Sequence, residues 1–327
     1  MEQRLLGGTG TRVSALGFGC GNVGGLMVRG TPEEQARAVR RALDAGVTYF
    51  DTAAMYGDGL SEQNLGRVLT ELNAWDRVAV GTKVRLTAEQ LNDPGAGVRN
   101  SLLASLGRLG RDSIDLLQLH NPLSVSKDES GARVGGQDLE PVIAGLQAVV
   151  REGLAGHVGF TGLGEMDAVR TMAADTRLET MQSYFNAINP SAGYAGKSGG
   201  AQDLGGIIDV AAGSGQGVIA IRVMAGGAMT GEEQRARLAS PGVGGALVQG
   251  NAYEVDLSKA VWRGSLAREL GLESAMELSF RFVIAKQGVS TALVGFSDQD
   301  QLEQAIGWAE RGPLSEEQVR RVLEGIG

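Results

Sequence analysis

Cysteine is nearly absent from the sequence, which has 327 residues and a single cysteine, Cys20. One cysteine excludes an internal disulfide and a zinc site built from several cysteines, and no metal site is predicted. Long apolar runs are missing as well. No stretch of about 18 apolar residues occurs, and the N-terminus lacks the apolar centre of a secretion signal. We therefore expect a cytoplasmic protein with no membrane partner.

Basic residues are also in deficit, with 30 Lys and Arg against 38 Asp and Glu and a net charge of −8. An acidic surface repels nucleic acids and anionic membranes, so neither is expected as a partner, and no oligomeric state is predicted. Aromatic residues make up 5% of the chain and proline occurs 7 times, whereas 51 glycines lie mostly between periodic segments. That distribution indicates many junctions between short strands, loops and helices.

Short apolar segments alternate with amphipathic segments along the whole chain, after a hairpin-like opening around residues 7–10. Buried strands are predicted over residues 15–20, 47–50, 77–83, 114–120, 156–162, 179–185, 217–223 and 289–295. Helices are predicted over residues 31–45, 61–72, 96–109, 139–152, 166–174, 204–212, between 258 and 286, and over 299–309. Such alternation is typical of parallel β-α-β units, and eight units predict a closed (β/α)8 TIM barrel forming one domain, 1–327.

Two longer segments, 189–203 and 225–256, interrupt this alternation. Loops at the C-terminal ends of barrel strands carry most ligand contacts in this fold. Both segments are therefore predicted to contact substrate or cofactor. Residues 55–60 and 122–138 are predicted to be substrate loops as well. All four segments are rich in glycine and poor in aromatic rings, which favours a small polar substrate, such as a sugar, over a flat steroid.

A glycine pattern at residues 19–24, GCGNVG, matches the fingerprint of Rossmann dinucleotide-binding domains, with Asp44 at the distance of a ribose-binding acid. In a Rossmann unit the helix opens within the fingerprint. Here the helix-start signal comes later, with Thr31 as N-cap, Pro32 at the first helical position and Glu34 completing a capping box. We therefore favour an open loop at the mouth of a barrel, and the Rossmann domain is the alternative.

Four polar residues follow three successive predicted strands: Asp51 and Tyr56 after the second, Lys83 after the third and His120 after the fourth. The ends of barrel strands converge on one mouth, so these side chains are expected to lie close together. Taken singly, each has a simpler explanation as a helix cap, a packing residue or a surface residue. Their combination favours a catalytic site, whereas His157, at the start of a strand, is predicted to be structural.

Reduction of a carbonyl group would use these four residue types, because the oxygen needs a proton as hydride reaches the carbon. A tyrosine with its ordinary pKa of about 10 is a reluctant proton donor. A neighbouring Lys83 would favour the phenolate and bring the pKa of Tyr56 closer to working pH, and Asp51 would keep Lys83 charged. A neutral His120 would orient the carbonyl oxygen.

At these positions the chain resembles the aldo-keto reductase superfamily. The motifs that carry the resemblance are residues 50–53 (FDTA), 56–57 (YG), 61–66 (SEQNLG), 81–83 (GTK) and 114–120 (IDLLQLH). The resemblance implies a (β/α)8 barrel that binds NADP(H), or less often NAD(H), at its mouth. It also implies that Tyr56 is the acid–base, that Lys83 and Asp51 tune it, and that His120 orients the carbonyl.

The resemblance further implies a set of cofactor contacts. Thr161 and Gln182 correspond to the carboxamide contacts, and the segment 224–227 corresponds to the pyrophosphate loop. The full set of implied cofactor-binding residues is Gly21, Asp51, Thr161, Gln182, Ile221, Arg222, Met224, Ala225, Gly226, Gly227, Gly295, Ser297, Gln301 and Gln304.

Several positions depart from the family pattern. Gly162 replaces an Asn common at the carboxamide, and Ile221 replaces an aromatic or Arg residue, for which Arg222 could substitute. The adenosine end, 296–298, has no Lys or Arg, and Gln301 and Ala305 stand at positions often held by Arg and Asn. A 2′-phosphate needs a cation or several donors, so NAD(H) is possible beside NADP(H).

The sequence thus predicts a nicotinamide-dependent oxidoreductase that interconverts small carbonyl compounds or sugars with alcohols or lactones. The alternative is a nicotinamide-binding regulatory module with little turnover. An intact set of four polar residues favours the enzyme.

Overall fold

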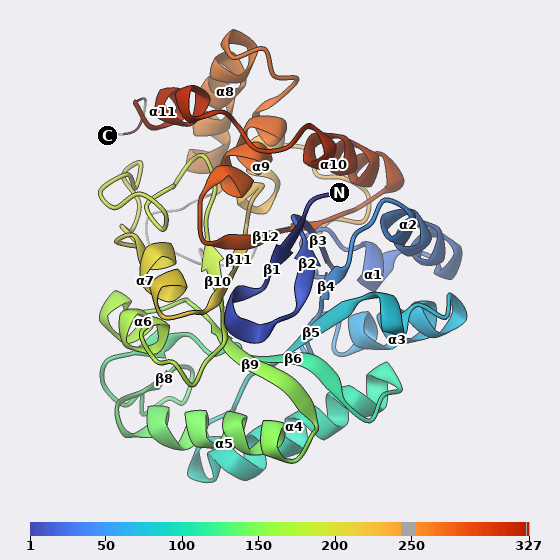
Figure 1. The fold of residues 1–327 in the computed structure, drawn as a ribbon, viewed down its shortest axis with the longest axis vertical. Helices are drawn as coiled ribbons and strands as arrows, with labels where there is room; N and C mark the ends of the chain where they lie inside the picture. The colour runs from blue at the N-terminus through green and yellow to red at the C-terminus, as the bar shows by residue number, and fades with distance from the viewer. Residues whose placement is uncertain (243–252, 325, 327) are drawn as a thin grey trace.

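The computed structural model describes residues 1–242, 253–324 and 326 and confirms the predicted (β/α)8 barrel. Its parallel strands close into a ring at the centre of the molecule (Figure 1). In order around the ring they are β3 (Leu16–Gly19), β4 (Tyr49–Asp51), β5 (Ala79–Val84), β6 (Ile114–Leu119), β9 (Ala155–Thr161), β10 (Thr180–Tyr184), β11 (Gly217–Ile221) and β12 (Val289–Gly295).

Helices surround the ring and cover the outer face of its strands (Figure 1). Those that agree with the predicted helices are α2 (Pro32–Asp44), α3 (Leu60–Glu71), α4 (Pro94–Leu109), α5 (Leu139–Arg151), α6 (Met166–Ala173), α7 (Ile207–Gly213), α8 (Tyr253–Glu269), α9 (Ala275–Ala285) and α10 (Gln299–Arg311). Two helices were not predicted, α1 (Leu26–Arg29) and α11 (Glu316–Glu324). A small sheet of β7 (Leu123–Ser124) and β8 (Val134–Gly135) lies in the connection after β6.

Helix starts follow capping chemistry. The predicted capping box of α2 is present, since Thr31 accepts from the amide of Glu34 and Glu34 accepts from the amide of Thr31. Helix α4 begins earlier than predicted because Asp93, which accepts from the amide of Ala96, caps it. Helix α8 also begins earlier, at residue 253, and residues 243–252 of the predicted loop 225–256 lie outside the described residues.

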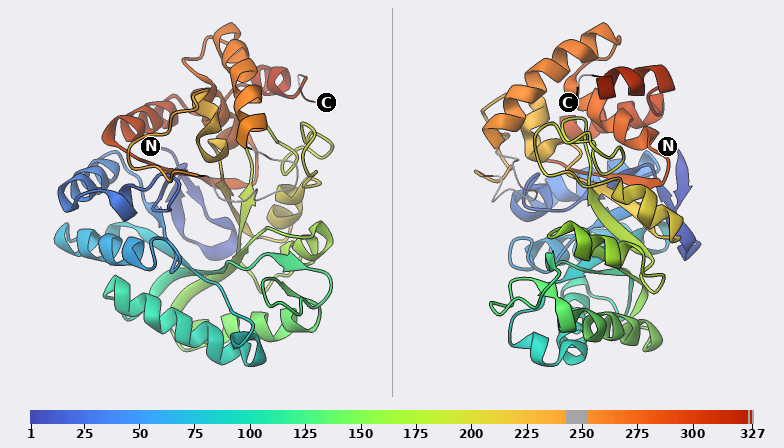
Figure 2. Two further views of the ribbon diagram at one scale, coloured as in Figure 1. Left: turned by 180° about the vertical axis from the view of Figure 1, so that it is seen from behind. Right: turned by 90° about the vertical axis from the view of Figure 1, so that its left-hand side faces the viewer.

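The N-terminal hairpin closes one end of the barrel. Strands β1 (Gln3–Leu5) and β2 (Arg12–Ser14) pair antiparallel, joined through the short 3-10 helix at residues 7–9. Leu6 and Val13 pack with the inward-facing strand residues Tyr49, Leu116 and Ile219. The hairpin lies at the opposite end of the barrel from the segment that follows β11 (Figure 2). Its packing covers the end of the barrel at which the strands begin.

The Rossmann alternative is wrong for the glycine pattern at 19–24. Its strand, β3, belongs to the closed ring between β12 and β4. The glycines form a loop at the mouth, and the four-residue helix α1 follows Gly25 before the capped α2 begins. No helix within the described residues combines the length and apolar character needed to cross a membrane.

Candidate active site

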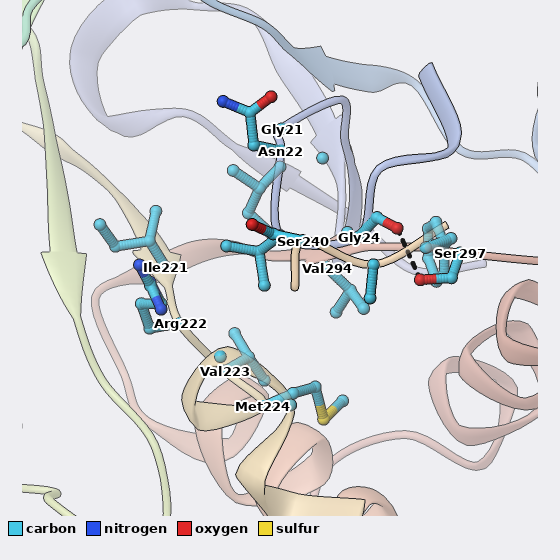
Figure 3. Close-up of a pocket in the computed structure, with 18 of the residues that line it drawn as sticks. Gly21, Asn22, Gly24, Ile221, Arg222, Val223, Met224, Ser240, Val294 and Ser297 are labelled. Carbon is cyan, nitrogen blue, oxygen red and sulfur yellow. Dashed lines mark hydrogen bonds between the residues drawn. The ribbon is translucent and has the colours of Figure 1, made fainter. Parts of the chain in front are cut away.

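A cleft of about 850 Å³ opens at the C-terminal ends of the barrel strands. Its lining includes Asp51, Tyr56 and His120 together with Gln304 and Trp308. Figure 3 shows the middle of the cleft, where the segment Ile221–Met224 faces the loop at residues 21–24. The cleft is large enough for a dinucleotide and a small substrate.

Asp51 and Lys83 form a buried ion pair beneath this cleft. Both side chains are about 1% exposed, and the Lys83 ammonium donates to Oδ1 of Asp51. Lys83 also donates to the backbone carbonyl of Thr52 at 2.8 Å. Burial alone would lower the pKa of Lys83, but the charge of Asp51 raises it above its ordinary value. The pair is therefore held in its ionised form.

Tyr56 stands over this pair at the edge of the cleft. The Lys83 ammonium lies 4.9 Å from the centroid of the Tyr56 ring, and the ring meets that of His120 edge-on at 6.1 Å. Burial raises the pKa of Tyr56, and the Lys83 charge lowers it again by a smaller amount. The predicted lowering by Lys83 is present, but the expectation that the net pKa falls toward working pH is wrong because desolvation outweighs it.

His120 contributes a neutral imidazole. Burial, together with the charges of Lys83 and Arg85, lowers its pKa to about 3. Its backbone amide donates to Val84 at 2.7 Å, and its buried Nδ1 has no hydrogen-bond partner within residues 1–242, 253–324 and 326. A neutral ring is what the orientation of a carbonyl oxygen requires, since it can donate without carrying charge.

The SEQNLG segment holds the strand ends that carry these groups. Ser61 donates to the carbonyl of Cys20 at 2.8 Å and shares a 2.8 Å hydrogen bond with the hydroxyl of Thr52. Buried Glu62 accepts from Thr82 at 2.5 Å and from Arg108 at 2.6 Å. The start of α3 thereby ties the ends of β3, β4 and β5 together.

Thr161 and Gln182, the two residues implied to contact the carboxamide, differ in their hydrogen bonds. Thr161 is 1% exposed, and its hydroxyl lacks a hydrogen-bond partner among the described residues, so it is available to a ligand in the cleft. Gln182 instead donates through Nε2 to Oδ2 of Asp51 at 2.6 Å. At Gly162, a Cβ would lie 3.1 Å from the carbonyl of Gln182, so the small residue allows close strand packing.

Most of the other implied cofactor residues also line the cleft. They are Gly21, Ile221, Arg222, Met224, Gly226, Gly227, Gly295, Ser297, Gln301 and Gln304. Ala225 does not line it, because its side chain packs in the hydrophobic core. Ala225 and Arg222 both have positive φ, 47° and 55°, which is uncommon outside glycine and often marks a functional segment.

At the residues implied to contact the adenosine, the polar side chains of Ser297, Asp298 and Gln301 form hydrogen bonds within the protein. Asp298 caps α10 by accepting from the amide of Gln301 at 2.9 Å, and Gln301 accepts from the amide of Ser297 at 2.8 Å. Ser297 donates its hydroxyl to the carbonyl of Gly24 (Figure 3). Ala305 is buried. Residues 296–298 themselves therefore supply no cation to the cleft.

Two arginines from the segment after β11 reach the cleft, and the sequence argument missed them. Arg235 donates to the carbonyls of Gly226 and Ser240, at 3.0 Å and 2.6 Å, while its Nη1 is buried with no partner among the described residues. Arg237 lines the same cleft and pairs with Glu34. The only signal in the sequence was their place within the long glycine-rich segment 225–256.

The cleft lining also includes Arg85 and Leu163, which sequence reasoning did not select. Asn22, Met55 and Pro122 line it as well, and they belong to segments that the sequence placed at the mouth or in the substrate loops. Asn22 accepts from the amide of Gly57 at 3.1 Å and so links the glycine loop to the Tyr56 turn. No cluster of three or more His, Cys, Asp or Glu side chains suited to a metal occurs in the part of the chain that the structure describes.

Comparison with known proteins agrees with this geometry. The model of the aldo/keto reductase family matches residues 15–325, nearly the whole chain. The chain belongs to the aldo/keto reductase family. Among relatives of this aldo/keto reductase, L-galactose dehydrogenase of Arabidopsis thaliana is 34% identical over 50% of the chain and 49% of the relative. L-glyceraldehyde 3-phosphate reductase of Escherichia coli O157:H7 is 26% identical over 100% of the chain and 92% of the relative.

Solved structures show the same fold. The holo form of the aldo-keto reductase AKR11C1 from Bacillus halodurans superposes with a TM-score of 0.74 at 21% identity, covering 100% of this chain and 97% of that one. An aldo-keto reductase from Klebsiella pneumoniae in complex with NADPH has a TM-score of 0.68 at 21% identity, covering 98% of this chain and 94% of that one.

Proposed function

We propose that this aldo/keto reductase reduces short aldehydes with NADPH and that Tyr56 is its acid–base. The observation that carries the proposal is the position of the Lys83 ammonium, which is paired with Asp51 and lies 4.9 Å from the Tyr56 ring, next to a neutral His120. Perturbed titratable groups gathered in a cleft are typical of catalytic sites.

The residues at the mouth divide the work of carbonyl reduction. His120 donates a hydrogen bond to the carbonyl oxygen and orients it. Tyr56 gives its phenolic proton to that oxygen, and Lys83 stabilises the phenolate that remains. Asp51 keeps Lys83 charged. When bound, the nicotinamide supplies the hydride that the carbonyl carbon receives. In the oxidation direction, Tyr56 accepts the proton instead.

Single-turnover hydride transfer tests this proposal against the alternative of a regulatory module. Enzyme loaded with NADPH is mixed with glyceraldehyde, and loss of the reduced nicotinamide is followed by absorbance. We expect one equivalent to be oxidised on the timescale of ordinary turnover, on the order of 1 s⁻¹ or faster. Tight cofactor binding without oxidation by any of a panel of aldehydes would favour the regulatory module.

We further propose that Arg235 and Arg237 give the enzyme a preference for NADPH over NADH. They supply the positive charge that residues 296–298 lack, and Arg235 has a buried N–H group free of partners within the described residues. An arginine pairs well with a phosphate monoester because its N–H groups match the phosphate oxygens.

Titration of both cofactors tests the assignment. We expect NADPH to bind more than about tenfold tighter than NADH, a difference of about 1.4 kcal/mol. The variant with both Arg235→Gln and Arg237→Gln should bind the two equally, and each single variant shows which arginine is responsible. Equal affinities in the unchanged protein would overturn the assignment.

For the substrate, we propose a short hydroxyaldehyde or sugar aldehyde that carries a negative group. Arg85 is exposed in the lining of the cleft and has no hydrogen bond or ion pair to any residue that the structure describes. It lies near His120, because its charge helps to lower the pKa of that ring. The reductase of Escherichia coli that matches the full chain is named for a phosphorylated aldehyde, which supports this class. In Arg85→Gln, the ratio of kcat/KM for glyceraldehyde 3-phosphate to that for glyceraldehyde should fall about tenfold, and an unchanged ratio would exclude this role.

A further inference from the structure

We propose that Tyr49 is a positioning residue that holds Asp51 ionised from inside the barrel, as a second phenol on the opposite side of the ion pair from Tyr56. Tyr49 is fully buried in the barrel interior and does not line the cleft. It therefore touches neither substrate nor cofactor and acts only through Asp51.

The contact is a hydrogen bond to the carboxylate. The Tyr49 hydroxyl donates to Oδ2 of Asp51 at 3.1 Å, and Gln182 donates to the same oxygen at 2.6 Å. Lys83 donates to the other oxygen, Oδ1. Asp51 thus has three donors, from β4, β5 and β10, and Tyr49 is the one that approaches from the hairpin end of the barrel.

Two glycines make room for this phenol. At Gly81, on β5, a Cβ would lie 2.6 Å from the Tyr49 oxygen, and at Gly17, on β3, a Cβ would lie 3.1 Å from the Tyr49 ring. The distance at Gly81 is too short for any side chain, and the distance at Gly17 is shorter than most Cβ contacts. Strand β5 therefore carries no side chain where the Tyr49 hydroxyl meets Asp51, and β3 carries none beside the ring.

Tyr49 remains a donor at any working pH. Burial, and then the nearby charge of Asp51, raises the pKa of Tyr49 well above its ordinary value. Burial also raises the pKa of Asp51, and the donors around it lower that pKa again. Hydrogen bonds to a carboxylate favour its charged form, so removal of the Tyr49 hydroxyl must raise the pKa of Asp51.

The other titratable groups around the pair do not replace Tyr49. Cys20, at the end of β3, is directed at the carbonyl of Phe18, and Asp115, on β6, accepts from the amide of Val80. Tyr56 lies on the cleft side of Lys83. When Asp51 is protonated, Lys83 is left as a buried cation without a counter-ion, which burial disfavours. Loss of the Asp51 charge therefore favours neutral Lys83, and a neutral Lys83 no longer lowers the pKa of Tyr56.

The test compares Tyr49→Phe with Thr291→Val. Thr291 is as fully buried as Tyr49, and both side chains lie next to Gly17 in the barrel interior. Unlike that of Tyr49, the Thr291 hydroxyl has no hydrogen-bond partner among the described residues. The first readout is the pH profile of single-turnover hydride transfer to glyceraldehyde, which rests on the proposed function. We expect the acid limb of Tyr49→Phe to move up by about one pH unit, the size of an ordinary environmental shift, with little change at higher pH. Thr291→Val should leave the limb in place.

The second readout does not depend on activity. Carbon-13 NMR of carboxyl-labelled aspartate follows the titration of Asp51, whose signal is identified by its loss in Asp51→Asn. Its pKa should rise in Tyr49→Phe and stay unchanged in Thr291→Val. If the Asp51 titration is the same in Tyr49→Phe as in the unchanged protein, Tyr49 is a packing residue and the inference is wrong. If the unchanged protein transfers no hydride but the NMR shift appears, the proposed function fails and the role of Tyr49 stands.

A second variant covers the case in which Tyr49→Phe does not fold. Gly81→Ala keeps the tyrosine but places a methyl group where the hydroxyl lies, and it should shift the Asp51 titration in the same direction. An unshifted titration in a folded Gly81→Ala protein would likewise overturn the inference.

Discussion

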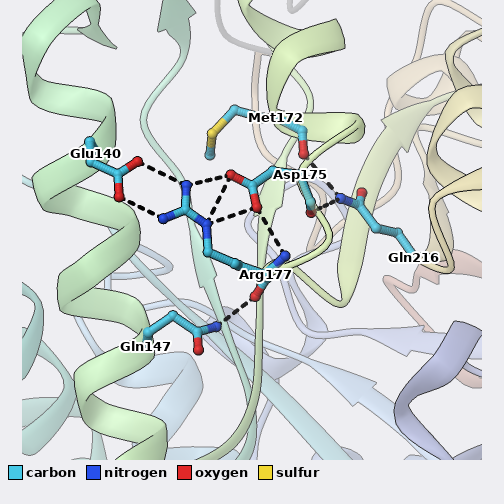
Figure 4. Close-up of polar contacts among 6 residues, drawn as sticks. All are labelled: Glu140, Gln147, Met172, Asp175, Arg177 and Gln216. Atoms are coloured by element: carbon cyan, nitrogen blue, oxygen red, sulfur yellow. Dashed lines mark hydrogen bonds and ion pairs between the residues drawn. The ribbon is translucent and has the colours of Figure 1, made fainter.

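Two charged clusters lie at opposite ends of the barrel and show what burial does to the same chemistry. At the end where β10 and β11 begin, Arg177 pairs with Glu140 at 2.6 Å and with Asp175 at 2.7 Å (Figure 4). The side chains of Arg177 and Glu140 are 44% and 68% exposed and that of Asp175 is 18% exposed, so all three keep contact with water. Their hydrogen bonds with Arg177 lower the pKa values of both carboxyl groups. At the mouth, the buried Asp51 and Lys83 are paired just as closely, but burial raises the pKa of Asp51.

The exposed cluster around Arg177 lies among hydrogen bonds that hold neighbouring connections in place. The backbone carbonyl of Arg177 accepts from Gln147 on α5 at 2.6 Å, and Gln216 donates to the carbonyls of Met172 and Asp175 at 3.0 Å and 3.1 Å (Figure 4). These contacts join α5, the α6–β10 connection and the start of β11. The comparison shows that an ion pair in water serves as a clamp, whereas a pair removed from water controls the protonation of its neighbours.

The largest expected effect on activity comes from Tyr56→Phe. This change removes the proton donor at the mouth while the cleft keeps its shape, so hydride transfer should fall about 10²- to 10⁴-fold. Cofactor affinity should remain near normal. Single-turnover rates and a cofactor titration measure both quantities, and a rate equal to that of the unchanged protein would disprove the acid–base assignment.

Lys83→Met should have the largest effect on stability. It leaves the Asp51 carboxylate buried without its counter-ion, which costs about 3–5 kcal/mol in the free energy of unfolding. It also removes the charge that lowers the pKa of Tyr56. In the pH profile of alcohol oxidation, the rise in rate that accompanies deprotonation of Tyr56 should therefore move to higher pH. Urea unfolding and a pH profile measure these changes.

Lys286→Met is the matched control for that variant. Lys286 pairs with Asp209 at 2.6 Å, but the Asp209 side chain is 62% exposed. Loss of this ion pair should therefore lower the free energy of unfolding by at most about 1 kcal/mol. Similar losses of stability in the two variants would contradict the role given to burial.

His120 should make stability depend on pH. Its pKa is about 3 in the folded protein and ordinarily about 6.5, so between these values the unfolded chain binds more protons. Stability is therefore lost as the pH falls below about 6.5. At pH 5.5 the loss due to His120 should be about 1.4 kcal/mol. Urea unfolding at pH 5.5 and 7.5 should show this loss in the unchanged protein and a smaller one in His120→Asn; equal losses would mean that His120 is not held neutral.

The smallest effect is expected at the exposed cluster. Arg177→Met should lower the free energy of unfolding by about 1 kcal/mol or less, since exposed pairs contribute little. Hydride transfer and its pH profile should not change. A shifted pH profile in this variant would show that the two ends of the barrel are coupled, and the contrast between them would fail.

Much of the fold and of the site could be predicted from the sequence. Strand and helix positions came from local periodicity, and helix starts such as that at Thr31 came from capping residues. The start of α4 is encoded just as locally, because Asp93 caps the helix and Pro94 stands at its first position. The place of Asp51, Tyr56, Lys83 and His120 followed from a general rule, since the ends of parallel barrel strands meet at one mouth.

The sequence by itself therefore determined the order of elements and the set of polar groups at the mouth, because both depend on short-range patterns. Tertiary structure alone decided that Arg235 reaches the cleft, that Gln182 donates to Asp51, and that the net pKa of Tyr56 rises. These features depend on residues far apart in the chain and on how much water each group loses. Desolvation is set by the packing of the whole barrel, and no local pattern encodes it.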